Sequence, residues 1–261
     1  MTILTFFLGF IGILILSIIL WIISIPLKNV SIVDPFWGIF FVVAGIIYNI
    51  PSPHNPQGNL ILILLCIWAF RLFLHLIIRN GTKKEDYRYQ NFRKRYGKKY
   101  WWKSLFQTFI LQAFLAWVIS IPIFISQIVI ERFYILDYFA ILLWLVGFAF
   151  ESISDLQLSE FKKNKQNKGK VLNTGLWKYS RHPNYFGNAC IWWAFGLFAL
   201  DYNTIFVLIS PIIMTILLMK VSGVSLLEKD LMKNKKGYSY YIQTTNSFFP
   251  WPPKKIKNEK D

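Results

Sequence analysis

Charged and amide side chains gather in one short stretch, YSRHPNYFGN at residues 179–188, directly before an apolar run. Arg181, Asn184, Tyr185 and Asn188 recur at helical spacing, so they share one face if a helix begins near Pro183. The N-terminus of a helix exposes N–H groups, and Arg181 would add a positive charge beside them. This pattern predicts a site for an anionic ligand, with anchoring at a membrane interface as the alternative.

Basic side chains also line a helix predicted further upstream. Arg71, His75 and Arg79 recur at intervals of four in FRLFLHLIIRN, which places them on one helix face. Arg79 is close enough to the end of its apolar run to reach the membrane interface, whereas Arg71 lies about two turns deeper and requires an anionic partner. His75 either packs among the helices or, between two Arg, lines a site.

Three carboxylates supply the opposite charge. Glu151 and Asp155 are four residues apart with Lys162 on the same helix face, so they form either a network along the helix or a surface for ligand hydroxyl and amide groups. Asp34, in SIVDPFWG, lies just inside another apolar run and directly before Pro35. An Asp at that position either caps a helix or, in an apolar setting, stays protonated and acts as an acid.

The composition indicates which elements must position these groups. Of the 261 residues, 55% are hydrophobic and only 16% are charged, whereas soluble domains have about 25% charged residues. Several runs reach the roughly 20 apolar residues that cross a bilayer. The first run lacks a basic leader, so we expect it to be retained as a helix. The sequence predicts an all-α polytopic membrane protein with about seven transmembrane helices, near residues 3–26, 31–50, 59–79, 104–127, 133–158, 182–200 and 203–221.

Lys and Arg are distributed unevenly among the connecting loops. Nine lie between Lys83 and Lys103 and seven between Lys162 and Arg181, whereas PSPHNPQGN and DYN have none. Because cytoplasmic loops carry the excess of Lys and Arg, the N-terminus is predicted outside and the C-terminus in the cytoplasm. The net charge of +16 then favours anionic lipid at the cytoplasmic face, and not nucleic acid, as a partner.

In this topology every candidate polar group falls in the cytoplasmic half of the bilayer, which predicts a polar cavity open to the cytoplasm. Several Arg near Lys-rich loops suit a diphosphate that carries a further phosphate. The sequence has no dinucleotide fingerprint and no P-loop, and Cys66 and Cys190 lie within apolar runs, so no metal site or disulfide is expected. Residues 1–261 are expected to form a single membrane domain, with a basic cytoplasmic tail over 222–261.

Longer segments resemble a known family. The run DLQLSEFKKNKQNKGKVLNTGLWKYSRHPNYFGN is similar to the C-terminal signature of steroid 5α-reductase-like membrane proteins, and more narrowly to their bacterial relatives of unassigned substrate. Those relatives also contain segments similar to SIVDPFWG, RNGTKKEDYRY, SGVSLLEKDL and YIQTTNSFFPWPP. The resemblance covers about residues 30–253.

This resemblance implies an enzyme of seven membrane helices that uses NADPH to reduce a carbon–carbon double bond conjugated to a ketone. The substrate would be a lipophilic steroid-, isoprenoid- or other lipid-like enone that enters from the bilayer. The cofactor would occupy a cytoplasmic-side cavity among the later helices. The cofactor-binding residues that it implies are Arg71, Arg79, Asp155, Lys162, Arg181, His182, Asn184, Tyr185, Glu228 and Asn246, and we expect His75 and Glu151 to line the substrate.

The sequence departs from the family pattern where the substrate ketone would bind. The steroid reductases have a Gln–Glu pair on the second helix and a Tyr on the third, whereas this second helix lacks the pair and WAFR, in the third, has no Tyr. Asp34 is therefore the candidate catalytic acid. Hydride addition to the β-carbon of an enone builds negative charge on the ketone oxygen, which an acid stabilises by a hydrogen bond.

Two other functions stay open. Membrane methyltransferases of the isoprenylcysteine and phospholipid type, which use S-adenosylmethionine, share an R-H-P-x-Y stretch followed by an acidic segment. Here SLLEK has the single acid Glu228 where a Glu–Glu pair is expected in those enzymes. The other alternative is a non-catalytic lipid-binding membrane protein. The expected location is the bacterial inner (plasma) membrane, or the endoplasmic reticulum in a eukaryote.

Overall fold

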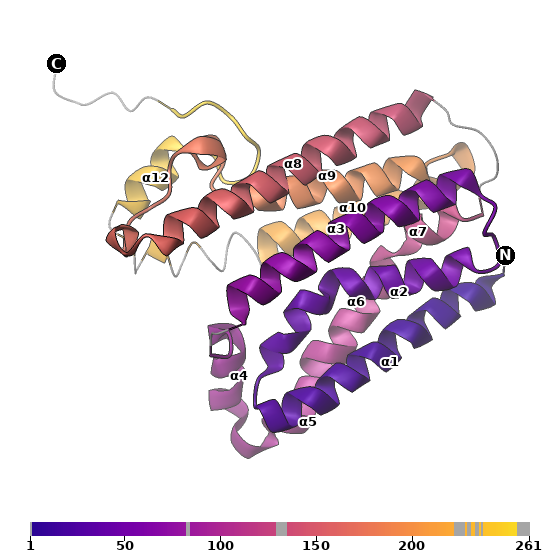
Figure 1. Cartoon of the computed structure of the whole chain (residues 1–261), viewed down its shortest axis with the longest axis horizontal. Coiled ribbons are helices and arrows are strands. Elements are labelled where there is room, and N and C mark those ends of the chain that lie inside the picture. Colours follow the sequence, from indigo (N-terminus) through magenta and orange to yellow (C-terminus); the bar gives the residue numbers. More distant parts are fainter. Residues whose placement is uncertain are drawn as a thin grey trace. The chain divides into compact units, whose positions relative to one another are not determined.

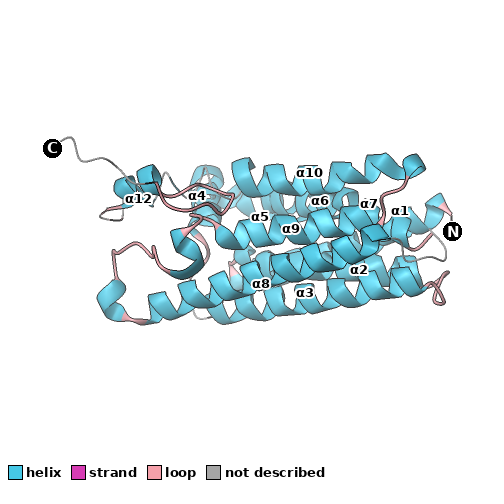
Figure 2. Ribbon diagram, turned by 90° about the horizontal axis from the view of Figure 1, so that it is seen from above, coloured by secondary structure: helices cyan, strands magenta, loops and turns pink. Residues whose placement is uncertain are grey.

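All regular elements of the described chain are helices, as Figure 2 shows by colour. The computed structural model describes residues 2–81, 84–128, 135–221, 228, 231–232, 235 and 237–254. The all-α prediction is therefore confirmed. The chain divides into two compact units, which are described separately: a first unit of Met1–Phe133 with Phe198–Ser210, and a second unit of Tyr134–Leu197 with Pro211–Asp261.

Helices long and apolar enough to cross a membrane match most of the predicted spans, and they identify an integral membrane protein. The described residues contain six: Ile3–Leu27, Val30–Asn49, Pro56–Asn80, Tyr87–Ile119, Ile135–Lys163 and Tyr202–Lys220. The remaining predicted span, 182–200, corresponds to α9 (Pro183–Phe198). Its 16 residues rise about 24 Å, which is less than the roughly 30 Å of a hydrocarbon core. The orientation of the helices across the membrane stays a prediction.

The first unit is built around α2 (Trp37–Asn49), which contacts both α1 (Ile3–Leu27) and α3 (Pro56–Asn80) (Figure 1). Phe40 and Phe41 on α2 are fully buried. Such a helix must be apolar around most of its circumference, which is why its sequence reads as one continuous apolar run.

The predicted helix at 104–127 is divided in the structure. Its parts are α5 (Tyr100–Ser104), the π-helical segment η3 (Leu105–Ile110), α6 (Leu111–Ile119) and α7 (Ile121–Ser126). Pro122 lies in the first turn of α7, where its missing N–H needs no partner. The proline thus separates α7 from α6. Upstream of α5 lie α4 (Tyr87–Tyr96) and the short turn η2 (Gly97–Lys99).

The second unit contains the long helix α8 (Ile135–Lys163) and α9, which begins at Pro183 as the sequence predicts. Two 3-10 turns lie between them, η4 (Lys165–Asn167) and η5 (Gly175–Lys178). The chain continues through η6 (Tyr202–Leu208), α10 (Ile209–Ile216), the π-helical segment η7 (Leu217–Val221) and α12 (Tyr238–Thr244). Of these, η6 belongs to the first unit and α12 to the second.

Candidate functional site

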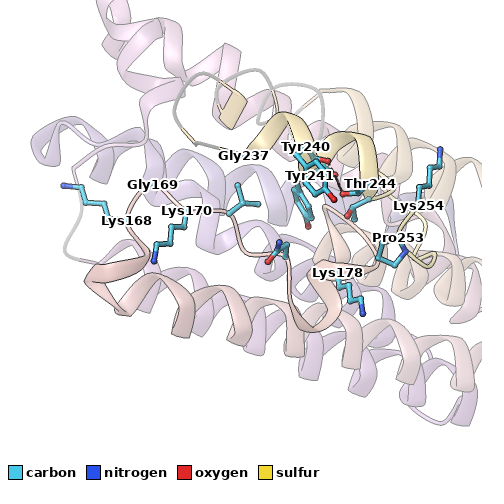
Figure 3. A pocket seen from close by; sticks show the side chains of 13 residues that line it. Lys168, Gly169, Lys170, Lys178, Gly237, Tyr240, Tyr241, Thr244, Pro253 and Lys254 are labelled. Atoms are coloured by element: carbon cyan, nitrogen blue, oxygen red, sulfur yellow. Dashed lines mark hydrogen bonds between the residues drawn. The ribbon is translucent and has the colours of Figure 1, made fainter. Parts of the chain in front are cut away.

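Each unit contains a cavity near residues that the sequence singles out. In the first unit, a cavity of about 350 Å³ lies between the segment Asn29–Phe36 and the end of α3, with Lys84 and Asp86 on its wall. In the second unit, a wider cleft of about 990 Å³ lies between the loop after α8 and α12 (Figure 3). The candidate residues Asp34, Asp155, Arg181 and Glu228 do not themselves line these two cavities.

Asp34 lies within the 3-10 helix η1 (Val30–Phe36), and the cap of that helix is Asn29, whose side chain accepts from the Ser31 N–H at 3.0 Å. The helix-cap interpretation of Asp34 is therefore wrong. Both carboxylate oxygens accept hydrogen bonds, Oδ2 from Arg88 at 2.8 Å and Oδ1 from the Tyr89 hydroxyl at 2.6 Å. Asp34 thus acts in this structure as a hydrogen-bond acceptor.

The segment that carries Arg88 and Tyr89 is fixed against η1 by further polar contacts. The Ser31 hydroxyl accepts from the Asp86 N–H at 2.6 Å, and Glu85 Oε1 accepts from the Val30 N–H at 2.8 Å. Arg93 pairs with Glu85 at 2.8 Å. These contacts join two segments about 55 residues apart and hold Tyr89 against Asp34. Neither Arg88 nor Tyr89 was predicted from the sequence, although the charge of Asp34 at the edge of an apolar run was a signal that it required a partner.

The helical spacing of Arg71, His75 and Arg79 is confirmed, because all three lie on the continuous helix α3. Arg71 and His75 are half-buried, whereas Arg79 is exposed and donates from Nε to the Asn80 side chain at 3.2 Å. These three residues belong to the first unit, and the other predicted cofactor residues belong to the second. Their roles toward cofactor and substrate stay predictions.

Close packing of two glycines positions the carboxylates of α8. A Cβ atom on Gly187 would lie 2.4 Å from the Glu151 backbone nitrogen and 2.5 Å from the Gly147 carbonyl oxygen. A Cβ atom on Gly147 would lie 2.6 Å from the Gly187 carbonyl oxygen. Small residues let membrane helices approach this closely. The approach brings the polar groups of α8 within reach of those on α9.

Two side-chain amides of α9 face the two carboxylates of α8. Asn184 Nδ2 donates to Asp155 Oδ1 at 3.1 Å, and Asn188 Nδ2 lies 3.4 Å from Glu151 Oε1. Glu151, Asp155 and Asn188 are buried. Among the described residues, the buried Oδ1 atom of Asn184 has no hydrogen-bond partner. Asp155 and Asn184, which the sequence assigned to the cofactor, therefore lie together and leave one acceptor open.

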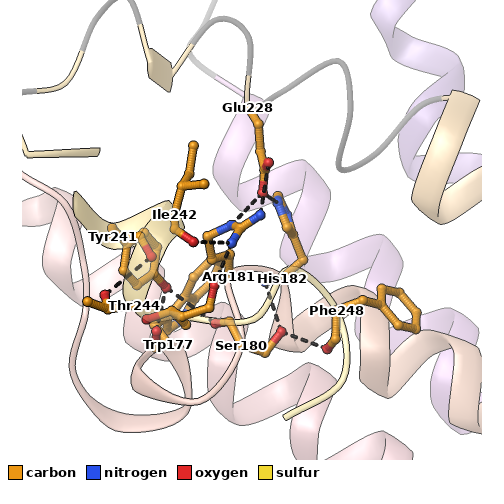
Figure 4. Close-up of polar contacts among 10 residues, drawn as sticks. Trp177, Ser180, Arg181, His182, Glu228, Tyr241, Ile242, Thr244 and Phe248 are labelled. Carbon is orange, nitrogen blue, oxygen red and sulfur yellow. Dashed lines mark hydrogen bonds and ion pairs between the residues drawn. The ribbon is translucent and has the colours of Figure 1, made fainter. Parts of the chain in front are cut away.

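Arg181 and Glu228 form a largely buried ion pair in the second unit (Figure 4). Arg181 donates from Nε to Glu228 Oε1 at 2.7 Å and from Nη2 to Oε2 at 3.1 Å. His182 Nε2 lies 3.1 Å from Glu228 Oε1, and the His182 ring stacks on Tyr185 with ring centroids 5.4 Å apart. The sequence-predicted residues Arg181, His182, Tyr185 and Glu228 are thus brought together.

Arg181 also binds the C-terminal segment. Its Nη1 donates to the carbonyl oxygens of Ile242, at 3.1 Å, and Thr245, and its backbone N–H donates to the carbonyl of Asn246 at 2.9 Å. Asn246 therefore contributes its backbone to this cluster. The Arg181 side chain is 9% exposed, and its positive charge is paired with groups of the protein itself.

Neighbouring residues extend this attachment. The Ser180 hydroxyl donates to the Phe248 carbonyl at 2.8 Å, and the Trp251 N–H donates to the Tyr179 carbonyl at 3.0 Å. Tyr241 donates its hydroxyl to the Trp177 carbonyl, and the indole of Trp177 donates to the Ser154 carbonyl at 3.0 Å. The YSRHP stretch thus holds the C-terminal segment, a role that the sequence analysis missed because the contacts involve backbone groups about 60 residues away.

The pKa of the Glu228 carboxyl reflects this environment. Burial would raise the pKa, but the hydrogen bonds from His182 and Arg181, together with the positive charge of Arg181, outweigh burial and lower it below its ordinary value of 4.5. Glu228 therefore stays ionised.

Lys162 is exposed near the end of α8, and its contact with a cofactor stays a prediction.

Two comparisons with known proteins found matches to this chain. The family described as "Protein of unknown function (DUF1295)" matches residues 20–245. An uncharacterized protein of Schizosaccharomyces pombe is 30% identical over 216 residues, which cover 70% of this chain and 61% of that protein. The chain thus spans about three-fifths of the length of that relative. No solved structure matches.

Proposed function

We propose, from the premise that this chain belongs to the DUF1295 family, that it is a membrane-embedded reductase. It would use NADPH to reduce a carbon–carbon double bond conjugated to a ketone in a lipophilic molecule. The proposal is based on the resemblance of residues 30–253 to steroid 5α-reductase-like proteins and on the polar cluster of the second unit.

The observation that carries the proposal is the open acceptor of Asn184. Its Nδ2 atom is held by Asp155 at 3.1 Å, so its Oδ1 atom points away from that carboxylate and is buried without a partner among the described residues. A buried acceptor left unsatisfied costs about 1–3 kcal/mol. The carboxamide N–H of a nicotinamide ring is a donor of the required kind. NADPH, when bound, would supply the hydride for the reduction.

Arg181 and His182 support this site as positioning residues. Both contact Glu228, and Arg181 also donates to Ile242 and Thr245, which fixes the turn directly before α9. Asn184 lies in the first turn of α9. A fixed turn therefore sets the direction of the Asn184 amide. This assignment differs from direct binding of phosphate by Arg181, because the guanidinium is already paired.

Asp34 stays the candidate for the group that stabilises the ketone oxygen. In this structure it accepts from Tyr89 at 2.6 Å and from Arg88 at 2.8 Å. We therefore widen the assignment to the Asp34–Tyr89 pair, since the phenol is the member that carries the proton in this arrangement. To donate to a developing oxyanion, the phenol would turn its single O–H from Asp34 to the ketone oxygen, while Arg88 stays paired with the carboxylate.

One observation favours a second candidate function, that of an S-adenosylmethionine-dependent membrane methyltransferase. Glu228 contacts both the Arg and the His of the RHPNY stretch, at 2.7 and 3.1 Å. An R-H-P-x-Y stretch combined with an acidic segment is the feature that those enzymes share. The single Glu228 in place of a Glu–Glu pair keeps the reductase as the first candidate.

Ligand-dependent thermal stability of the purified protein tests the proposal. A ligand that binds the folded state at about 100 times its Kd stabilises it by roughly 2.7 kcal/mol. We expect NADPH to raise the Tm of the wild type, and Asn184→Ala to remove that rise. Asn91→Ala is the matched control, because Asn91 is an exposed amide on α4 of the first unit.

The result separates the candidates. Stabilisation by S-adenosylmethionine and not by NADPH would overturn the reductase proposal in favour of the methyltransferase. Stabilisation by NADPH that persists in Asn184→Ala would overturn the assignment of Asn184, even though the cofactor is correct. Stabilisation by neither ligand would contradict both enzymatic candidates.

A further inference from the structure

The cleft of about 990 Å³ in the second unit lies outside the polar cluster of Asp155 and Asn184. Three segments form it: the loop after α8, the turn η5, and α12 with the chain that follows it (Figure 3). Hydrogen bonds join these segments, because the Tyr241 hydroxyl on α12 donates to the Trp177 carbonyl in η5, and Lys235 Nζ donates to the carbonyl of Lys170 in the loop after α8 at 2.8 Å. The walls of the cleft are therefore tied together by hydrogen bonds.

The lining of this cleft is strongly basic. Its four charged side chains are Lys168, Lys170, Lys178 and Lys254, and no Asp or Glu is among its described lining residues. All four lysines are exposed. Figure 3 shows these side chains spread along the cleft with their ends apart, so together they make its surroundings positively charged and attract an anion. The ligand that complements this cleft is accordingly negatively charged.

Aromatic side chains are exposed on the same segments. Tyr240 is 63% exposed, Phe249 66% and Trp251 66%. Tyr240 lines the cleft, and Trp251 lies just before Pro253 and Lys254, which also line it. Large aromatic side chains beside Lys are typical of the interface between a membrane and water. The exposed aromatic surface suits acyl chains and headgroups better than bulk water.

We propose that the lysine cleft binds the phosphate headgroup of an anionic phospholipid. The lysines contact the phosphate, and Tyr240 and Trp251 lie against the adjoining glycerol and upper acyl region. Lys near a membrane surface attracts anionic lipid, and each contributes to affinity. Such a lipid would join the loop after α8 to the C-terminal segment. This binding does not depend on the reductase chemistry.

Three features together favour a lipid over a soluble phosphate compound. The chain is an integral membrane protein, so anionic lipid is present at high local concentration. The phosphate-binding side chains are flexible Lys point charges and include no Arg fork among the described lining residues. The aromatic side chains next to the cleft are exposed, as they would be if they faced a bilayer.

Thermal unfolding in detergent with short-chain lipids tests this inference. We expect dihexanoyl phosphatidylglycerol to raise the Tm of the full chain more than dihexanoyl phosphatidylcholine does. The double variant Lys170→Gln with Lys178→Gln should weaken phosphatidylglycerol binding on the order of tenfold. The charge-matched control is Lys163→Gln with Lys165→Gln, which alters two exposed lysines of the same unit that do not line the cleft.

Each outcome decides the inference. A shift specific to phosphatidylglycerol that the cleft variant loses and the control keeps would support it. Equal shifts with the two lipids, or an undiminished shift in the cleft variant, would overturn it. Competition with inorganic phosphate or adenosine 2′,5′-bisphosphate gives a further outcome. If either compound displaces the lipid at a concentration below that at which the lipid binds, the cleft is a site for a soluble phosphate ligand and the lipid assignment is overturned. NADPH-dependent stabilisation, tested through Asn184→Ala, reports on the proposed function independently.

Discussion

The guanidinium of Arg181 and the carboxylate of Glu228 are joined by two hydrogen bonds of 2.7 and 3.1 Å, although 47 residues separate them along the chain. Their side chains are 9% and 15% exposed. The contact fixes Arg181, two residues before the start of α9, to a residue that follows η7. It is the contact that we propose positions Asn184.

Removal of the Glu228 charge should destabilise the second unit. We expect Glu228→Gln to lower the free energy of unfolding by about 1–3 kcal/mol, because charge-assisted hydrogen bonds to Arg181 and His182 are weakened. Thermal unfolding in detergent measures the change. Glu160→Gln is the control: the Glu160–Lys163 pair is about two-thirds exposed on both sides, so its loss should change little. Equal effects of the two substitutions would contradict the importance of the buried pair.

The stability that Glu228 contributes should depend on pH. The pKa of its carboxyl is lowered on folding, so its stabilising contribution is complete above the ordinary value of 4.5 and is lost as the pH falls through the folded-state pKa. The difference in Tm between wild type and Glu228→Gln should therefore be largest near neutral pH and shrink in acid. A difference that stays constant from pH 7 to pH 3 would show that ionisation of Glu228 is not responsible.

The close packing of α8 against α9 should not tolerate a methyl group at Gly187. Gly187→Ala would place a Cβ atom 2.4 Å from the Glu151 backbone nitrogen, so the helices must separate, at a cost on the order of 1–3 kcal/mol. Gly12→Ala is the matched control on α1, because the added Cβ there meets the flexible end of Ile47. Thermal unfolding compares the two variants, and a Gly12→Ala loss as large as that of Gly187→Ala would contradict this account.

The Tyr89 hydroxyl should stabilise the first unit through Asp34. Tyr89→Phe removes a 2.6 Å hydrogen bond at a residue that is 5% exposed, and we expect a loss of about 1–2 kcal/mol. Tyr202→Phe removes the same hydroxyl at a position that is 94% exposed and should leave stability unchanged.

The catalytic role proposed for Asp34 is tested once a substrate is identified. If Asp34→Asn leaves turnover unchanged, Asp34 is not the catalytic acid.

Labelling of single cysteines tests the predicted orientation. In a Cys66→Ser and Cys190→Ser background, His54→Cys should react with a membrane-impermeant maleimide added outside intact cells, because its loop lacks Lys and Arg. Lys98→Cys should react after the membrane is permeabilised. Both positions are exposed, so reactivity reports on the side of the membrane and not on burial. The reverse pattern would invert the topology.

The sequence alone determined the helical architecture, and the reason is local. Apolar runs of membrane length fix where helices form, since unpaired backbone groups are not tolerated in lipid. The start of α9 at Pro183 and the shared helix of Arg71, His75 and Arg79 followed from residue spacing. The division of the predicted helix at 104–127 needed the structure, although Pro122 was its visible signal.

Only the tertiary structure decided which polar groups meet. The sequence offered Arg181 as part of a site for an anionic ligand, whereas the structure pairs it with Glu228 and with carbonyls of the C-terminal segment. It also gave Asp34 the partners Arg88 and Tyr89, from a segment about 55 residues away. A charge inside a membrane protein requires a partner, and the sequence shows where such charges lie along a helix. The identity of the partner depends on which distant segment packs beside that charge.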